Sequence, residues 1–289
     1  MIKFENVKVE GWEPAIRGMR NPMNSWEKSD SRPAFNVVEN FAPGDPMEEK
    51  YWKWAEQYNS NIKIGPNDHD LMMKLAKAGS EHSKYRRMIV VWVDITAPLY
   101  WWKEFDTYKV GTVANSCSTM HKIHSKEFTL DDFSCEHLLD KADLIDPEYR
   151  FDIEKDIALS AINVDGDRCY FTPKGHLEHT CQILNRYREK FLEAKENAKK
   201  QKDESDRAKR AGQVPASSGR YFEMMAKKYW WQMIQLLPSS YNQRRTVMLN
   251  YEVLAGIYPK RKDHKLDEWH DFCDWIKSLP YSEIITLEE

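Results

Sequence analysis

A short run of residues near the middle of the chain carries a high density of polar side chains. Residues 112–119 read T-V-A-N-S-C-S-T. Hydroxyl, amide and thiol groups are supplied by Thr112, Asn115, Ser116, Cys117, Ser118 and Thr119. Such groups hydrogen-bond to a phosphate, a ribose or a base edge. They do not do acid–base work near pH 7 unless a neighbour perturbs them, so they favour ligand binding over catalysis. A Ser/Thr-rich segment without any ligand explains the same residues equally well.

Other residue types that carry chemistry form weaker patterns. Cys117 is a candidate nucleophile, but the sequence identifies no His paired with it. His121-x-x-His124 and His176-x-x-His179 each place two imidazoles on one helical face, without further metal ligands nearby in the sequence. Neither a glycine-rich phosphate loop nor a G-x-S-x-G elbow occurs. We therefore predict no metal site and leave the catalytic residues unassigned.

Two predicted elements position the polar run. Residues 87–95 form an apolar, β-branched segment, which predicts a buried strand. Pro98 suits the first turn of a helix, which we expect over about 99–109. The order of strand, helix and polar run places the hydrogen-bonding groups beyond a rigid, buried element.

Apolar spacing predicts the other elements. A strand and a short turn are expected within 1–20, a loop over 21–45, and a hairpin or turn around 165–167. Asp68 is expected to cap a helix over 69–79. Further predicted helices cover 46–60, 127–143, 146–162, 174–210, 220–237, 242–258 and 265–278. Together these elements predict an α/β (α+β) fold with a central sheet, flanking helices and a long helical insertion.

We expect a single domain over 1–289 with one projecting arm. The segment 193–211 carries charges of both signs and has almost no apolar face. This pattern is typical of a solvated helix extension or a mobile arm. Aromatic helices at 99–106 and 221–234 fit either an oligomer interface or a monomer core.

The composition limits the class of protein. Apolar residues make up 41% and aromatic residues 12% of the chain, so a substantial core is available. A formal net charge of -3 does not indicate nucleic-acid binding. Five Cys without a C-x-x-C pair, and no secretory signal, favour a reduced, intracellular protein. We expect the cytoplasm of a bacterium or phage, although the sequence itself indicates only the inside of a cell. No apolar run is long enough to span a bilayer, so no membrane partner is expected.

Residues 81–100, E-H-S-K-Y-R-R-M-I-V-V-W-V-D-I-T-A-P-L-Y, resemble a segment of the flavin-dependent thymidylate synthases, the ThyX family. Glu81, His82, Ala97 and Pro98 match the family's pattern. A second block near the C-terminus, 236–263, resembles the family at Leu237, Pro238, Asn250, Leu254, Arg261 and Asp263. The matches fall on framework positions more than on ligand positions, so they point to the fold before the activity.

The ThyX signature R-H-R-x-x-S meets different side chains here. Its R-H-R falls on Thr107, Tyr108 and Lys109, and its Ser on Thr112. Its later Ser falls on Cys117 and its Arg-Tyr pair on Thr119-Met120. Lys offers a point charge in place of a bidentate fork, and Thr offers no charge. Each lost charge-assisted bond weakens anion binding by about 1.5–3 kcal/mol if nothing replaces it.

Charge also changes in the second block. Glu252 stands where the family has an Arg, which adds a charge that repels anions. Arg244, Arg245, Lys260 and Arg261 cluster in sequence around this block and are candidates to compensate.

The resemblance implies a ThyX-like fold in which 125–220 is an enlarged insertion. It implies FAD binding at His82, Thr107, Tyr108, Lys109 and Asn250. It implies binding of a pyrimidine nucleotide such as dUMP at Thr112, Asn115, Ser116, Cys117, Ser118, Thr119 and Arg261. It further implies a homotetramer with sites between subunits, methylenetetrahydrofolate as the carbon donor and NADPH as the reductant.

Three classes of function stay open. The first is a divergent flavin-dependent methylase of dUMP or a related pyrimidine nucleotide. The second is a catalytically silent ThyX-fold protein that binds a nucleotide or another protein. The third is a structural or assembly role without a small ligand.

Overall fold

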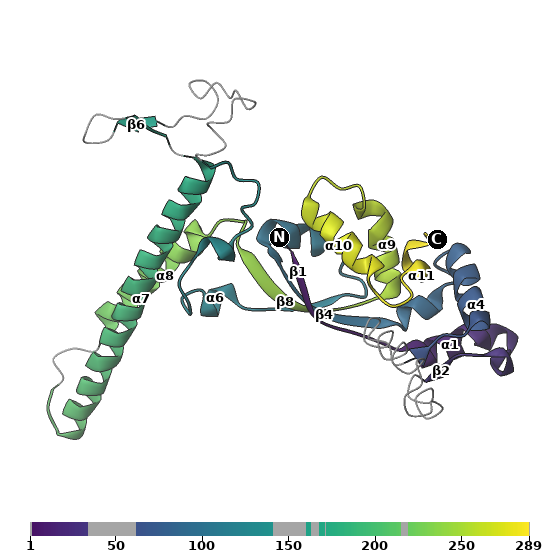
Figure 1. Ribbon diagram of the computed structural model, residues 1–289. Coiled ribbons are helices and arrows are strands. Elements are labelled where there is room, and N and C mark those ends of the chain that lie inside the picture. The colour runs from purple at the N-terminus through teal and green to yellow at the C-terminus, as the bar shows by residue number, and fades with distance from the viewer. Residues whose placement is uncertain are drawn as a thin grey trace, which may run out of the picture. The chain divides into compact units, whose positions relative to one another are not determined.

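The computed structural model describes residues 2–33, 62–140, 160–162, 168–170, 172–214 and 219–288 (Figure 1). Contacts divide the chain into two compact units. The first comprises 1–97, 101–116 and 244–289, and the second comprises 98–100 and 117–243. The predicted insertion, 125–220, falls inside the second unit. The predicted helix 46–60 lies outside the described residues.

A four-stranded sheet with the order β1-β4-β8-β5 forms the first unit's centre. Its strands are β1 (Lys3–Glu10), β4 (Val90–Pro98), β8 (Asn242–Asn250) and β5 (Val113–Ser116). The pairs β1–β4 and β5–β8 are antiparallel. In β4, Val91, Val93 and Ile95 are buried, and the alternate residues Trp92 and Asp94 lie on the other face. The predicted strand and the α/β class are confirmed.

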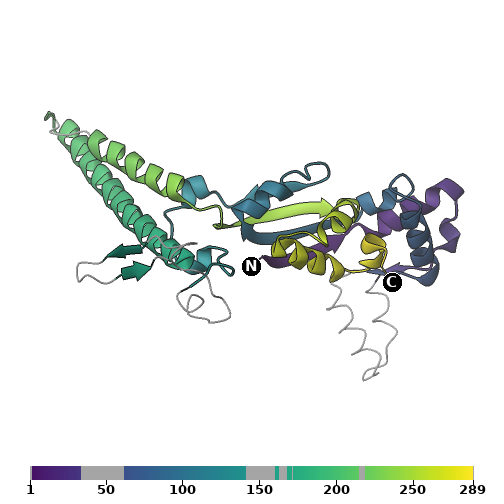
Figure 2. The ribbon, with the colours of Figure 1, turned by 90° about the horizontal axis from the view of Figure 1, so that it is seen from above.

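Aromatic side chains fill the core of this unit. They come mainly from α5 (Leu99–Phe105) and α10 (Asp267–Lys277), and α9 (Tyr251–Arg261) packs beside α10 (Figures 1 and 2). Trp101 is fully buried, and its ring centroid lies 4.9 Å from that of Trp269. The predicted helix 99–109 therefore ends at Phe105, and its aromatic side chains serve the monomer core.

The N-terminal part of the first unit holds a helix where the sequence predicted a turn. Helix α1 (Trp12–Arg20) forms because Trp12, Ala15, Ile16 and Met19 recur at helical spacing on its buried face. Gly11 precedes it at φ 96°, and a Cβ there would overlap the Met88 carbonyl oxygen, so only glycine fits there. The other elements are η1 (Asn21–Met23), η2 (Trp26–Lys28), β2 (Arg32–Pro33), β3 (Ile62–Lys63), α4 (Pro66–Lys77), η3 (Lys84–Arg87) and α11 (Glu283–Thr286).

The second unit is organised around a helical hairpin. Helices α7 (Pro173–Arg210) and α8 (Arg220–Leu236) pack along one another, which confirms the predicted helices 174–210 and 220–237. Its shorter elements are α6 (Thr119–Lys122), η4 (Leu130–Asp132), β6 (Ser160–Ile162) and β7 (Arg168–Tyr170). The hairpin predicted around 165–167 is flanked by the antiparallel pair β6–β7.

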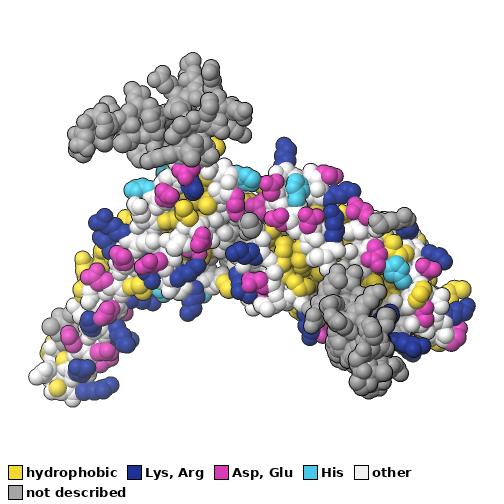
Figure 3. Space-filling view, viewed as in Figure 1, with side chains coloured by type: hydrophobic (Ala, Val, Ile, Leu, Met, Phe, Trp, Pro, Cys, Tyr) yellow, Lys and Arg dark blue, Asp and Glu magenta, His cyan; other side chains and the backbone are white. Residues whose placement is uncertain are grey.

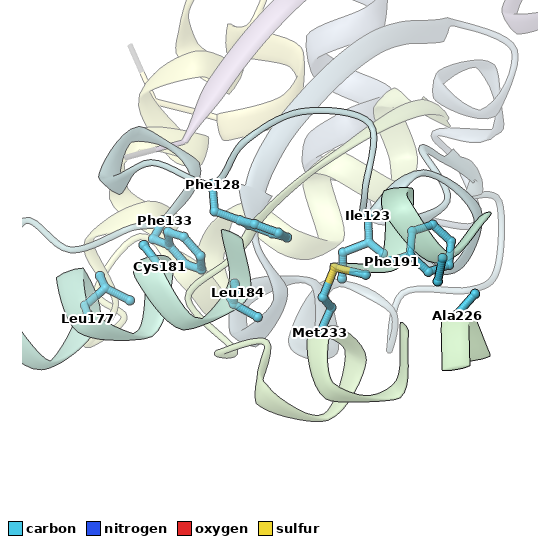
Figure 4. Close-up of a cluster of buried hydrophobic side chains, with 10 residues drawn as sticks. Ile123, Phe128, Phe133, Leu177, Cys181, Leu184, Phe191, Ala226 and Met233 are labelled. Atoms are coloured by element: carbon cyan, nitrogen blue, oxygen red, sulfur yellow. The ribbon is translucent and has the colours of Figure 1, made fainter. Parts of the chain in front are cut away.

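A cluster of buried apolar side chains joins the two long helices (Figure 4). Leu184 of α7 and Met233 of α8 are fully buried in it, together with Phe128 from the preceding loop. Gly219 directly precedes α8 and lies close to α7. A Cβ there would stand 2.9 Å from the carbonyl oxygen of Ala198, so this close approach requires glycine. Figure 3 shows Lys/Arg and Asp/Glu side chains interspersed along the helical hairpin of α7 and α8.

Two predicted helices are wrong in part. Residues 242–250 of the predicted helix 242–258 form β8, because Gln243, Val247 and Leu249 alternate as buried residues, and the helix begins only at Tyr251. It also continues through Pro259 to Arg261 instead of breaking there. Over 127–140 the structure has no α-helix but the short 3-10 helix η4, which begins with a capping box between Thr129 and Asp132.

The predicted helix 146–162 and the predicted cap at Asp68 also differ from the structure. Residues 160–162 form β6, and 146–159 lie outside the described residues. Asp68 lies inside α4, which begins at Pro66, so it does not cap the helix. The predicted helix 265–278 is confirmed as α10. None of the helices in the described part combines the length and apolar character that a membrane span requires.

Candidate functional site

The polar run predicted to bind a ligand begins on an edge strand of the first unit. Strand β5 pairs with β8 through Asn115 opposite Thr246 and Ser116 opposite Arg245. It ends the sheet, and all four of its residues are exposed, Val113 to 59%. Among the described strands, none covers its outer edge, so its backbone groups and polar side chains face outward. This geometry suits hydrogen bonds to a ligand.

The loop between α5 and β5 is held against the start of α9. Gly111 has φ 76°, and a Cβ there would stand 3.0 Å from Val253 Cγ2 and 3.2 Å from Asn250 Nδ2. Asn250 in turn caps α9, since its Oδ1 accepts a hydrogen bond from the Val253 backbone N–H at 3.0 Å. Asn250, a predicted cofactor-binding residue, therefore positions the loop that carries the signature residues.

The four signature positions lie on this loop. Thr107 Oγ1 donates to the Glu104 carbonyl at 2.7 Å, whereas Lys109 is exposed. The hydroxyl of Thr112 is buried and finds no hydrogen-bond partner within the described residues. A buried hydroxyl without a partner is costly, so Thr112 is a natural contact for a bound group.

Tyr108 and Arg261, predicted to bind cofactor and substrate, meet in one cluster. Arg261 Nε donates to the Tyr108 hydroxyl at 2.8 Å, and Nη1 donates to Glu104 Oε2 at 2.6 Å. Trp269 Nε1 donates to the same carboxylate oxygen at 3.0 Å. The Arg261 guanidinium also lies 4.3 Å from the Trp269 ring centroid, a cation–π distance. Glu104 therefore neutralises the charge of Arg261, which was predicted to bind a substrate phosphate.

The neighbouring arginines are also paired with carboxylates. Arg245 Nη1 lies 2.7 Å from Asp106 Oδ1, and its guanidinium stacks 4.2 Å over Trp102. Arg244 Nη2 lies 2.7 Å from Asp94 Oδ2. Of the four cations proposed to compensate for the lost signature arginines, three thus have an acidic partner, and Lys260 is exposed.

Glu252 does not add a free negative charge. Its Oε2 accepts from Arg86 Nε at 2.8 Å, and Arg86 Nη1 donates to the Ile284 carbonyl at 3.1 Å. The pair is nearly buried, with the Arg86 side chain 6% exposed. The repulsion predicted for Glu252 is therefore compensated by Arg86. The predicted cofactor residue His82 is exposed and lies next to Ser83, which also contacts Glu252.

The rest of the predicted substrate-binding residues belong to the second unit. Cys117 is exposed, and its carbonyl accepts from Gln243 Nε2 at 3.2 Å. Ser118 caps α6 by accepting the His121 backbone N–H at 3.2 Å, and Thr119 is the first residue of that helix. The substrate roles of Cys117, Ser118 and Thr119 stay predictions.

FAD requires a partner for its diphosphate and a surface for its ring. Near the signature loop, the exposed Lys109 supplies a charge and the buried Thr112 hydroxyl supplies an unused hydrogen-bonding group. Arg244, Arg245 and Arg261 already hold carboxylates. The residues present can therefore contact the diphosphate of a flavin, with fewer cationic contacts than the family's arginines would make.

The first unit also contains a cleft that no local pattern in the sequence indicates. A cavity of about 530 Å³ is lined by residues of β1, α1 and the following segment, including Arg17, Arg20 and Trp26. Three residues that line it, Arg20, Ser29 and Ser31, hold a buried carboxylate behind it. Asp68 accepts from Arg20 Nε at 2.6 Å and from both Ser29 Oγ and Ser31 Oγ at 2.7 Å. Burial raises the pKa of Asp68, but hydrogen bonds from the two serines and Arg20 outweigh it and hold the pKa below its ordinary value. This network connects segments far apart in sequence, which local patterns do not reveal.

The paired histidines do not assemble a metal site in the described residues. No group of three or more His, Cys, Asp or Glu is placed there to hold an ion. His176 and His179 are exposed on α7. His124 is half-buried, with its ring centroid 4.6 Å from that of Phe191.

Comparisons with known proteins give a structural likeness without a sequence match. No family model matches the chain, and no curated protein matches it. Two solved structures of ThyX from Helicobacter pylori, each with FAD and dUMP, are similar at 12% identity. They have TM-scores of 0.49 and 0.48 and cover 97% and 99% of this chain and 97% and 96% of their own.

A third similar structure is the UMP/dUMP methylase PolB from Streptomyces cacaoi bound with 5-Br dUMP. It is 11% identical, with a TM-score of 0.40, over 99% of this chain and 94% of its own. With TM-scores below 0.5, these likenesses carry no inference about ligands or chemistry. Two of the similar structures belong to the ThyX family, which the sequence resembles, and the third is a pyrimidine-nucleotide methylase.

Proposed function

We propose that the chain is a divergent ThyX-like protein that binds a pyrimidine nucleotide such as dUMP and methylates it. The observation that carries the proposal is the outward-facing strand β5, which presents Asn115 and Ser116 next to the signature loop. Amide and hydroxyl groups recognise a pyrimidine edge or a ribose without needing a charge. Lys109 is the cation on this loop, and it supplies attraction for a phosphate.

FAD is the proposed cofactor, with Lys109 as its charged contact on the signature loop, and the Thr112 hydroxyl is proposed to contact the nucleotide. When bound, FAD would supply the hydride for methyl formation. Methylenetetrahydrofolate as carbon donor and NADPH as reductant belong to the same proposal. The contribution of the chain itself is to orient the nucleotide along β5 and to fix the loop through Gly111 and Asn250.

Ligand binding by the purified protein tests this function. A flavin absorbance spectrum and a rise in melting temperature with dUMP are expected for the wild type. Replacing Asn115 and Ser116 by Ala should reduce the dUMP shift. The matched control Lys8→Gln changes an exposed residue on β1, at the opposite edge of the sheet, and should leave the shift unchanged. A colourless protein that neither takes up FAD nor responds to dUMP contradicts the proposal.

A second candidate function, nucleotide binding without catalysis, is favoured by the pairing of Arg244, Arg245 and Arg261 with carboxylates. In that case dUMP stabilises the protein, while added FAD gives no bound flavin. Growth of a thymidine-requiring strain that expresses the chain separates the two, because only a methylase restores growth. If no nucleotide changes the melting temperature, the result supports a structural or assembly role.

A homotetramer is part of the proposal as well. The exposed edge of β5 offers backbone groups that a second copy can pair with. Sedimentation or light scattering of the purified protein measures the oligomeric state directly.

A further inference from the structure

The second unit contains a groove that the proposed function does not use. It has a volume of about 560 Å³ and lies along α7 and α8, with α6 and His124 closing it. This volume lies within the range of about 300–1,000 Å³ that small-molecule sites occupy. The groove is lined by residues of the second unit alone.

A row of lysines lines one wall of the groove. Lys195, Lys199 and Lys202 lie three and four residues apart on α7, so they share one face of the helix, and Lys227 joins them from α8. Among the described residues, none of these four lysines forms an ion pair with a carboxylate. By contrast Lys200, on another face of the same helix, pairs with Glu196 at 2.7 Å. The charge that faces the groove is therefore available to an anion.

His124 adds a hydrogen-bonding group that is not satisfied. Its Nδ1 is buried and has no partner in the part of the chain that the structure describes. Burial lowers the pKa of His124, and the charges of Lys195, Lys122 and Arg188 lower it further. An anion in the groove would offset these positive charges.

Aromatic side chains lie beside these lysines on both helices, Phe191 on α7 and Trp230 on α8. Phe191 and Ala226 lie at one end of the buried cluster, where Figure 4 shows them close together, and both also line the groove. Trp230 is held by its Nε1, which donates to the Met120 carbonyl at 3.0 Å. A fixed indole and phenyl ring beside a row of lysines offer an apolar surface and positive charge to one ligand.

We infer that this groove binds a small molecule of the nucleoside polyphosphate class. From Lys195 to Lys202 the helix advances by seven steps, a rise of about 10 Å, which is comparable to the length of a chain of two or three phosphates. The lysines would bind those phosphates, and the rings of Trp230 and Phe191 would contact the base. Glu223 also lines the groove, and its negative charge disfavours a longer polyanion.

Calorimetric titration of the full chain with ATP, dUTP and inorganic triphosphate tests the inference. The wild type should bind the two nucleotides, and bind inorganic triphosphate more weakly because it lacks a base. Replacing Lys195, Lys199 and Lys202 by Gln should weaken nucleotide binding at least tenfold. The control Lys200→Gln changes the same residue type off the groove and should bind like the wild type. Helical circular dichroism and melting curves establish that each variant is folded.

Two further readouts make the result specific. The proton titration of His124, followed by NMR, should move to higher pH when dUTP is bound, and should not move in the triple-lysine variant. The Asn115/Ser116 variant should keep its dUTP binding, which separates this groove from the proposed dUMP site. Failure of all three ligands to bind, or equal binding by the triple variant, overturns the inference. Tighter binding of a single-stranded oligonucleotide than of either nucleotide also overturns it.

Discussion

The arginines close to the candidate site, Arg244, Arg245 and Arg261, are each paired with a carboxylate. The sequence offers several cations near the expected anion site, and the fold supplies Glu104, Asp106 and Asp94 as their partners. A guanidinium held by a carboxylate attracts a phosphate less strongly, because the carboxylate repels it. Neutral groups on β5 and the exposed Lys109 thus become the main recognition elements of the proposed site.

Removing the partner of Arg261 tests how much its cluster stabilises the unit. The Arg261 side chain is 15% exposed, so Glu104→Gln leaves a largely buried charge without its carboxylate. We expect a loss of about 1–3 kcal/mol in the free energy of unfolding, measured in urea. Asp274→Asn, which breaks an exposed pair with Lys277, should cost less than about 1 kcal/mol. Equal losses in the two variants would show that the cluster is not special.

Asp94 gives the first unit a dependence on acidic pH. Hydrogen bonds from Thr246, Arg244 and Asn6 lower the pKa of Asp94 from 3.8 to about 2. A lowered pKa in the folded state means that the stabilisation is complete above pH 3.8 and is lost as the pH falls toward 2. Urea unfolding between pH 5 and pH 2 should show a smaller loss of stability in Asp94→Asn than in the wild type. An identical pH profile for both proteins contradicts this assignment.

At the scale of elements, the candidate site depends on a contact between two distant segments. The loop before β5 is placed by Gly111 against the cap of α9. Neither residue stands out in a local pattern, although Asn250 appears in the family resemblance. A loop fixed at such a contact keeps the polar strand in one position.

Gly111→Ala should disturb this contact. At φ 76° an alanine costs about 1 kcal/mol, and its Cβ would also lie 3.0 Å from Val253 Cγ2. We expect a lower melting temperature and a weaker dUMP response. Gly212→Ala is the matched control, because its φ of 72° imposes the same backbone strain with nothing within 4 Å. If both variants lose the same stability and bind dUMP equally, the contact does not position the loop.

Local patterns predict elements well where one periodicity dominates. The spacing in α7, α8 and α10 identifies these helices, and the β-branched run identifies β4. The sequence predicts a helix over 242–258, yet the alternate burial of residues 242–250 against the sheet makes that part a strand. In the site, side-chain types were readable from the sequence, but the carboxylate partners of the arginines come from the tertiary fold.

For the whole molecule, the two units have separate cores. Trp101, Trp269 and Phe272 pack in the first, and Leu184, Phe191 and Met233 pack in the second. Units with their own cores commonly have their own stabilities. The chain can therefore lose order in one unit before the other.

Matched cavities in the two cores test this independence. Leu184→Ala and Leu254→Ala each remove a side chain that is 0% exposed, and each should cost about 2–5 kcal/mol. Hydrogen exchange should accelerate in α7 and α8 for the first variant and in α9 and α10 for the second. Uniform acceleration across both units in either variant would show a single cooperative structure.

The close approach of Gly219 to Ala198 has a consequence for shortening the chain. Ala198 lies on α7 and Gly219 directly before α8, and a Cβ on Gly219 would stand only 2.9 Å from the Ala198 carbonyl oxygen. A turn of a few residues can bridge this close approach, and closing a shorter loop costs less entropy. Such a truncated chain keeps the packing of Phe191 against Ala226 and loses Lys199 and Lys202. The outer part of the helical hairpin can thus be removed without removing the core of the second unit, and its charged residues are removed with it.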